Sequence, residues 1–162
     1  MKPLLNGALF QLNWFICIFT NNSLAIASTF VFLVIHARYF VQFSKEWFYI
    51  VIFTCLGFSF DLLLCKLNLL TFQVFPFWLF CLWLSFATCL FHALGFFYQK
   101  IGLLAVIIML AIPFNYYLGA KLTSTSITLP ELTLFLITLY WLLVLPIFIR
   151  MITSYRNANE NN

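Results

Sequence analysis

The amino-acid sequence predicts an all-α integral membrane protein, a bundle of six transmembrane helices joined by short loops. Hydrophobic residues make up 65% of the 162 residues and charged residues 7%, and the mean hydropathy is +1.06. A soluble domain is about half apolar and about a quarter charged, so a water-soluble globule of this size could not bury so much apolar surface. Most side chains therefore require lipid as their solvent.

The chain divides into six apolar segments, each close to the length of about 20 residues that a spanning helix needs. We expect helices at residues 4–20, 24–43, 47–65, 75–98, 101–120 and 131–149. They form a single transmembrane domain, and residues 151–162 are expected to be a polar cytoplasmic tail.

Short polar breaks separate the segments. Residues 21–23, Asn-Asn-Ser, form a tight turn, and Ser44 offers an N-cap to the third helix. Pro76 falls in the first turn of the fourth helix, where proline is tolerated. Gln-Lys at 99–100 separates the fourth helix from the fifth. Residues 128–131 have the S/T-x-x-E spacing of a capping box, which opens the last helix.

The first segment also resembles a cleavable signal peptide, because Met1 and Lys2 precede an apolar run. Asn6, Gln11 and Asn13 interrupt that run, which favours an uncleaved first helix. Cleavage would leave five spans instead of six.

Basic residues predict the orientation of the helices. With six spans, one side of the membrane holds Lys2, Arg38, Lys45, Lys100, Arg150 and Arg156. The other side holds Lys66 and Lys121. By the positive-inside rule the richer side is cytoplasmic, so both termini are expected in the cytoplasm. Because these charges are scattered singly, we expect no nucleic-acid partner.

Asp61 is the acidic residue that lies well inside an apolar run, and charged groups within a bilayer are costly and usually face the bundle interior. It lies about 6 Å below the end of the third predicted helix, at about 1.5 Å per residue. Candidate partners at the same level are Tyr116, Asn115 and the stem of Lys121. A structural hydrogen bond or ion pair and a functional carboxylate both remain open for Asp61.

Two histidines, His36 and His92, lie toward the cytoplasmic side of the second and fourth predicted helices. A histidine pair is able to relay protons or to form half of a metal site. No third ligand of suitable type is expected at their level, because Asp61 lies toward the outer side. The five cysteines are odd in number and form no CxxC pair. We interpret the histidines as interhelical hydrogen-bonding groups and expect no metal and no cofactor.

Small and polar residues at helical spacing predict the faces on which helices meet. Such residues allow close approach and hydrogen bonding between membrane helices. The expected packing stripe comprises Trp78, Ser85, Thr88, Gly57 and Gly95. The candidate intramembrane polar site comprises Asp61, His92, His36, Asn13, Gln11, Tyr116 and Asn115. No catalytic motif was found, and we expect no catalytic residues.

Several short motifs occur in a recognisable order along the chain. They are Phe10 to Phe15 (FQLNWF), His36, Lys45-Glu46-Trp47, Asp61, Trp83 with Phe86-Ala87-Thr88, His92, and Pro113-x-x-Tyr116-x-x-Gly119-Ala120. In their order and spacing they resemble a family of small bacterial inner-membrane proteins catalogued as domain of unknown function 2878. The resemblance runs from about Asn6 to Arg150, with Ile112 where the family pattern leads us to expect glycine.

The resemblance implies a role near membrane lipid chemistry, because family members are often encoded beside a cyclopropane-fatty-acid synthase and other lipid-modifying enzymes. We therefore expect a non-catalytic accessory to lipid or fatty-acid modification, with membrane lipids and a lipid-modifying enzyme as partners. A small transporter or proton-coupled carrier that uses Asp61 is the first alternative. An intramembrane lipid-modifying enzyme is the second, and the sequence leaves the oligomeric state open.

Overall fold

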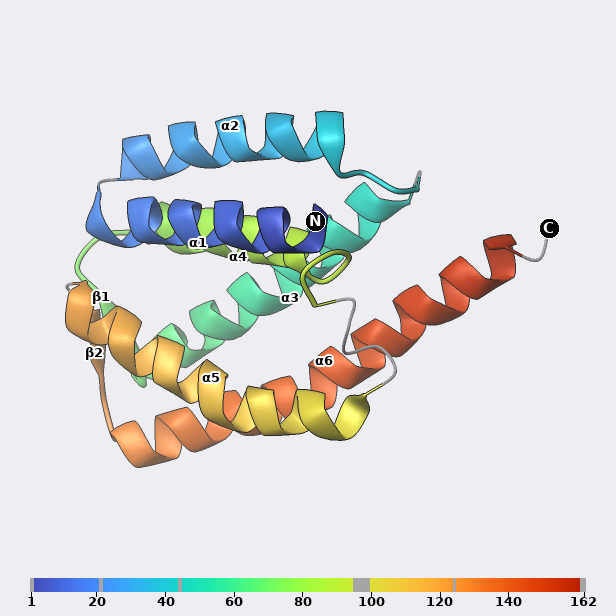
Figure 1. Cartoon of the computed structure of the whole chain (residues 1–162). Helices are drawn as coiled ribbons and strands as arrows, with labels where there is room; N and C mark the ends of the chain where they lie inside the picture. The colour runs from blue at the N-terminus through green and yellow to red at the C-terminus, as the bar shows by residue number, and fades with distance from the viewer. Residues whose placement is uncertain (1, 21, 44, 95–99, 124, 161–162) are drawn as a thin grey trace.

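The computed structural model describes residues 2–20, 22–43, 45–94, 100–123 and 125–160 of the chain (Figure 1). In this part of the chain six helices and two short strands follow one another. They are α1 (Lys2–Phe19), α2 (Asn22–Tyr39), α3 (Glu46–Lys66), β1 (Leu70–Phe72), α4 (Phe77–Cys89), α5 (Ile101–Leu122), β2 (Thr125–Ile127) and α6 (Pro130–Glu160).

The expected helices are present, but the described residues contain three, not six, that are long and apolar enough to cross a membrane. These three stretches are Glu46–Lys66 of α3, Gly102–Leu122 of α5 and Pro130–Tyr155 of α6. Helix α4 is apolar but short, with 13 residues. Helices α1 and α2 have 18 residues each, and polar or basic residues lie among them.

The fourth helix is shorter than predicted. It was expected over 75–98, whereas α4 ends at Cys89 and the chain continues in turns through Leu94. Backbone hydrogen bonds change there to the tighter i−3 pattern, as from Phe91 N to Thr88 O at 3.3 Å. His92 therefore lies in a turn and not in a helix. Gly95, predicted for the packing stripe, lies outside the described residues.

The last helix is longer than predicted. It was expected over 131–149, whereas α6 continues as helix through residues 151–160, within the stretch expected to be a polar cytoplasmic tail. Proline occupies the first helical position, Pro130, where its missing N–H costs nothing. The preceding residue, Leu129, has a φ of 47°. The carbonyl of Thr128 accepts a hydrogen bond from Thr133 Oγ1 at 2.6 Å, which ties the start of α6 to β2.

The two loops at one end of the molecule pair with each other. Strands β1 and β2 are antiparallel, with Thr71 opposite Ser126. Each strand has three residues, too few for a period-two pattern to be visible in the sequence. In Figure 1 this sheet lies at the end opposite both termini, and it links the α3–α4 connection to the α5–α6 connection.

The helices form two groups (Figure 1). Helices α1, α2 and α4 pack together, and α3 packs on α4, while α5 packs on α6. Large apolar side chains such as Phe30, Leu110 and Phe135 are exposed on the outside. Asn6 and Asp61, by contrast, are fully buried. This distribution suits a surface that faces lipid and an interior in which polar groups find partners.

Gly57 of α3 lies directly against the indole of Trp83 of α4. A Cβ atom at position 57 would lie 2.5 to 2.8 Å from three atoms of that ring. The two helices therefore approach as closely as they do because residue 57 has no side chain.

We predict that Gly57→Ala destabilises the protein by about 1–3 kcal/mol, because the added methyl group forces the buried Trp83 to shift. Gly119→Ala is the matched control, since nothing lies within 4 Å of its Cβ position. Thermal unfolding of the purified protein in detergent, followed by tryptophan fluorescence, measures both. Equal unfolding temperatures for the two variants would contradict the prediction.

Candidate functional site

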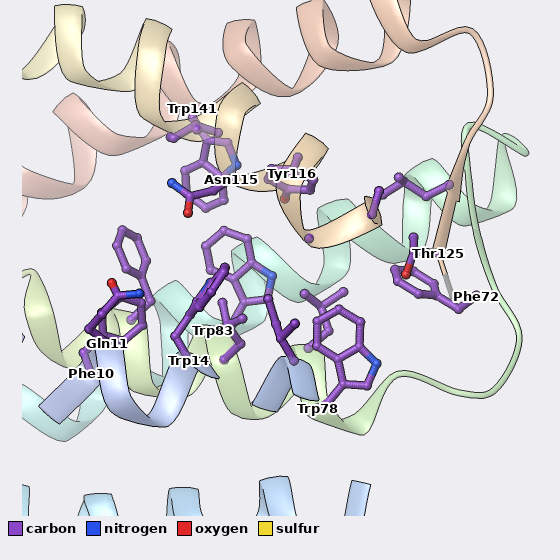
Figure 2. A pocket seen from close by; sticks show the side chains of 18 residues that line it. Phe10, Gln11, Trp14, Phe72, Trp78, Trp83, Asn115, Tyr116, Thr125 and Trp141 are labelled. Carbon is purple, nitrogen blue, oxygen red and sulfur yellow. The ribbon is translucent and has the colours of Figure 1, made fainter. Parts of the chain in front are cut away.

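A pocket of about 220 Å³ lies between the two groups of helices. It is lined mainly by aromatic and aliphatic side chains from α1, α4, α5, α6 and the β1–β2 sheet. Figure 2 shows Trp14, Trp83 and Gln11 on one side and Asn115 and Tyr116 facing them from the other. A concave, mostly apolar site with a few polar groups is the usual form of a small-molecule site.

Asp61 of α3 holds two walls of this pocket in place. Its Oδ2 accepts a hydrogen bond from Trp83 Nε1 at 2.6 Å, and its Oδ1 accepts one from Tyr116 Oη at 2.6 Å. The carboxyl group is completely buried. Trp83 in turn stacks on Trp141 of α6, with ring centroids 4.8 Å apart. One carboxyl group thus connects α3, α4 and α5 directly, and α6 through the stacked indoles.

The sequence indicated some of these contacts. Tyr116 was an expected candidate partner of Asp61, and the structure brings the two together. Asn115 does not reach Asp61, because its Nδ2 donates to Ala111 O of its own helix at 2.6 Å. Gln11 and Asn115 lie together with Tyr116 and the predicted stripe residue Trp78 on the lining of the pocket. Trp83, the second partner of Asp61, was not predicted as a site residue.

A second set of predicted residues forms a polar seam between α1, α2 and α4. Asn13 Nδ2 donates to Ser85 Oγ at 2.7 Å and to Thr29 Oγ1 at 3.0 Å. Farther along the same helices, Asn6 Nδ2 donates to Thr88 Oγ1 at 3.4 Å. All five side chains are buried, and these hydrogen bonds hold the three helices together. The Oδ1 atoms of Asn6 and Asn13 have no partner among the described residues.

The two histidines lie in a separate cluster. His36 Nε2 is 2.9 Å from Glu46 Oε1, and His92 Nε2 is 3.2 Å from the same oxygen. The expectation that no third ligand of suitable type lies at their level is therefore wrong, because Glu46 supplies a buried carboxylate there. Asp61 does not join this cluster, so the predicted single polar site divides into an Asp61 site, a seam and a histidine–glutamate cluster.

Glu46 was missed because its position suggested a different role. It begins a long apolar run directly after Lys45, where an acidic residue ordinarily compensates the helix dipole. The pair of histidines could have pointed to Glu46, because an imidazole that is buried in an apolar chain needs a hydrogen-bond partner.

These features define a helical protein with span-length apolar helices, a lipid-suited exterior and an aromatic pocket braced by a buried carboxyl group. The chain belongs to the family described as protein of unknown function DUF2878, to which residues 3–147 match. The matched region contains the pocket, Asp61 and the histidine–glutamate cluster. No curated protein and no solved structure matches the chain.

We predict that Asp61→Leu destabilises the protein much more than Asp61→Asn does. Leucine leaves the Trp83 N–H and the Tyr116 O–H without acceptors, at about 1–3 kcal/mol for each buried group. Asparagine still accepts from Trp83 with its oxygen, and its amide donates to the Tyr116 oxygen. Thermal unfolding in detergent compares the two variants with the wild type. Equal losses in both variants would show that these two hydrogen bonds do not determine stability.

Proposed function

We propose that this is a bacterial inner-membrane protein that holds a segment of a lipid chain in its aromatic pocket. It acts as a non-catalytic accessory to lipid or fatty-acid modification. The observation that carries the proposal is the pocket itself, an apolar space of about 220 Å³ between helices whose outer surface is also apolar. Molecules that reach such a pocket from the surrounding bilayer are lipids.

The size and lining of the pocket limit its occupant. About 220 Å³ is below the range of roughly 300–1,000 Å³ that is typical of sites for whole drug-sized molecules. The occupant is therefore part of a longer molecule, such as the portion of an acyl chain next to its ester or carboxyl group. Gln11 and Asn115 are exposed residues on opposite walls, and their amides are placed to hydrogen-bond an ester or carboxyl oxygen.

The shorter helices also lie within the membrane in this proposal. The amide nitrogens of Asn13 and Asn6 on α1 donate to side chains of α2 and α4 through the seam, which supports placing these helices inside the bilayer. Under this proposal the chain has six spans, and the positive-inside rule then favours cytoplasmic termini because most basic residues lie toward that side. Both termini lie at the same end of the helices in Figure 1, as this orientation requires.

An accessory role is favoured over the alternatives by how Asp61 is bonded. Both of its oxygens accept from side chains that form the pocket wall. A proton-coupled carrier would need this carboxyl group to exchange protons with a pathway, yet it is fully buried beneath Trp83 and Tyr116. An enzyme would need further reactive groups beside Asp61, whereas the histidines lie in the separate cluster with Glu46. The lipid is then passed to, or presented to, a lipid-modifying membrane enzyme.

The test uses a brominated fatty acid as the probe, because bromine quenches nearby tryptophans. Trp14, Trp78, Trp83 and Trp141 line the pocket, and they are four of the five tryptophans in the chain. We expect dibrominated stearic acid to quench the purified protein in detergent saturably. Ordinary stearic acid should reverse the quenching by competition.

Gly119→Leu should weaken this binding about tenfold or more, equivalent to about 1.4 kcal/mol. Gly119 lines the pocket, and none of the described residues lies within 4 Å of its Cβ position, so a larger side chain there has open space to enter. Gly102→Leu is the matched control, because it is equally open, lies in the same helix and is not among the pocket residues. The proposal fails if a folded Gly119→Leu protein binds the probe as tightly as the Gly102→Leu control.

A further inference from the structure

His36, Glu46 and His92 come from three separate segments and converge on one point. His36 lies in the last turn of α2, Glu46 in the first turn of α3, and His92 in the turn that follows α4. All three are buried, with exposed fractions of 1%, 0% and 4%. One donor atom from each lies within 4.8 Å of the other two.

The spacing of these donor atoms matches that of metal ligands. Glu46 Oε1 lies 2.9 Å from His36 Nε2 and 3.2 Å from His92 Nε2. Two ligands on a tetrahedral ion with bonds of about 2.0–2.1 Å are about 3.3 Å apart. The three donor atoms all lie within 4.8 Å of one another, so rotation of the side chains could bring them around one ion.

Neighbouring residues orient these three side chains, as the residues around the ligands do in metal sites. Gln42 Nε2 is 3.1 Å from His92 Nδ1, and the Gln42 backbone N–H donates to Glu46 Oε2 at 2.8 Å. The Phe40 ring stacks on the His36 ring, with centroids 6.0 Å apart. Partners that orient the outer nitrogen or oxygen of a ligand are a regular feature of metal sites.

The convergence of two imidazoles on one carboxylate oxygen points beyond internal hydrogen bonding. Among the described residues His36 Nδ1 has no hydrogen-bond partner, so this imidazole is held through the Nε2 that faces Glu46. His92 directs its Nε2 at the same oxygen. Two imidazole nitrogens and a carboxylate oxygen that converge from three segments are the arrangement of a ligand set.

We infer that His36, Glu46 and His92 bind a divalent transition-metal ion such as Zn²⁺ or Fe²⁺. Two imidazoles and one carboxylate are the ligands of catalytic zinc sites and of nonhaem iron sites, and they leave at least one position open. Imidazole-containing sites prefer these ions over Mg²⁺ and Ca²⁺, which favour all-oxygen ligand sets. Gln42 is exposed and lies against both Glu46 and His92, so the ion reaches the site from the aqueous side.

This inference does not depend on lipid binding. The cluster lies at the end of α3 opposite Asp61, and none of its three residues lines the pocket. A protein that binds no fatty acid would therefore still be expected to bind the ion.

The experiment titrates untagged full-length protein in detergent with Co²⁺, whose visible absorption reports coordination. We expect one Co²⁺ per chain, displaced by Zn²⁺, and a rise in unfolding temperature with Zn²⁺. Glu46→Gln and His92→Gln should each weaken binding by more than roughly 100-fold, since even the loss of an outer partner costs about 10–100-fold. Asp61→Asn is the matched control, because it removes the other carboxylate of α3 and should leave Co²⁺ binding unchanged.

His92→Cys provides a readout that does not rest on loss of binding. A thiolate at this position should retain Co²⁺ and add a sulfur-to-cobalt charge-transfer band in the near ultraviolet. That band in the wild type would instead assign the binding to the native cysteines and overturn the inference. Three other results would also overturn the inference. One is the absence of saturable Co²⁺ binding to the wild type, and another is binding by the Glu46→Gln/His92→Gln double variant at wild-type affinity. The third is Co²⁺ binding by His92→Cys without the new band.

Discussion

The short contacts of the Asp61 carboxyl group are the constraint on which the pocket depends. A lone carboxyl group within an apolar helix is costly, and here its two oxygens receive hydrogen bonds from α4 and α5. The same bonds fix the planes of Trp83 and Tyr116, and Gly57 provides the space in which the indole lies. Replacing Asp61 would remove the acceptor that α4 and α5 share. The buried carboxyl group and the pocket wall that it holds are thus one structural unit.

Much of the helical architecture could be predicted, because apolar runs and polar breaks are local signals. The six helices were expected near their observed positions, but the ends of the fourth and the last were not. The chain leaves helical geometry after Cys89, and the following turn carries His92 to Glu46, a contact 46 positions away in sequence. The three-residue strands were missed for the same reason, since their pairing joins residues 70–72 to residues 125–127. Local periodicity carries no information about such partners.

For the candidate residues too, the sequence indicated which polar residues matter but not all of the residues with which they pair. Asp61, Tyr116, His36 and His92 stand out from sequence because a polar group in an apolar run requires an explanation. Trp83 does not stand out in a chain with five tryptophans and 22 phenylalanines, although it donates to Asp61. Glu46 stands at the edge of a run and therefore suggests a helix cap. Both become recognisable when three-dimensional contacts assign each buried polar atom a partner.

The length of α6 has a consequence for how the molecule sits in a bilayer. Its apolar stretch, Pro130–Tyr155, has 26 residues and extends about 39 Å, whereas the hydrocarbon core of a bilayer is about 30 Å thick. Such a helix must lean or project from the membrane, and Figure 1 shows it running obliquely to α1 with its last turns beyond the other helices. Hydrophobic mismatch then links the lean of α6 to the thickness of the surrounding lipid. Because Trp141 of α6 stacks on Trp83, the composition of the membrane acts on the same wall that Asp61 braces.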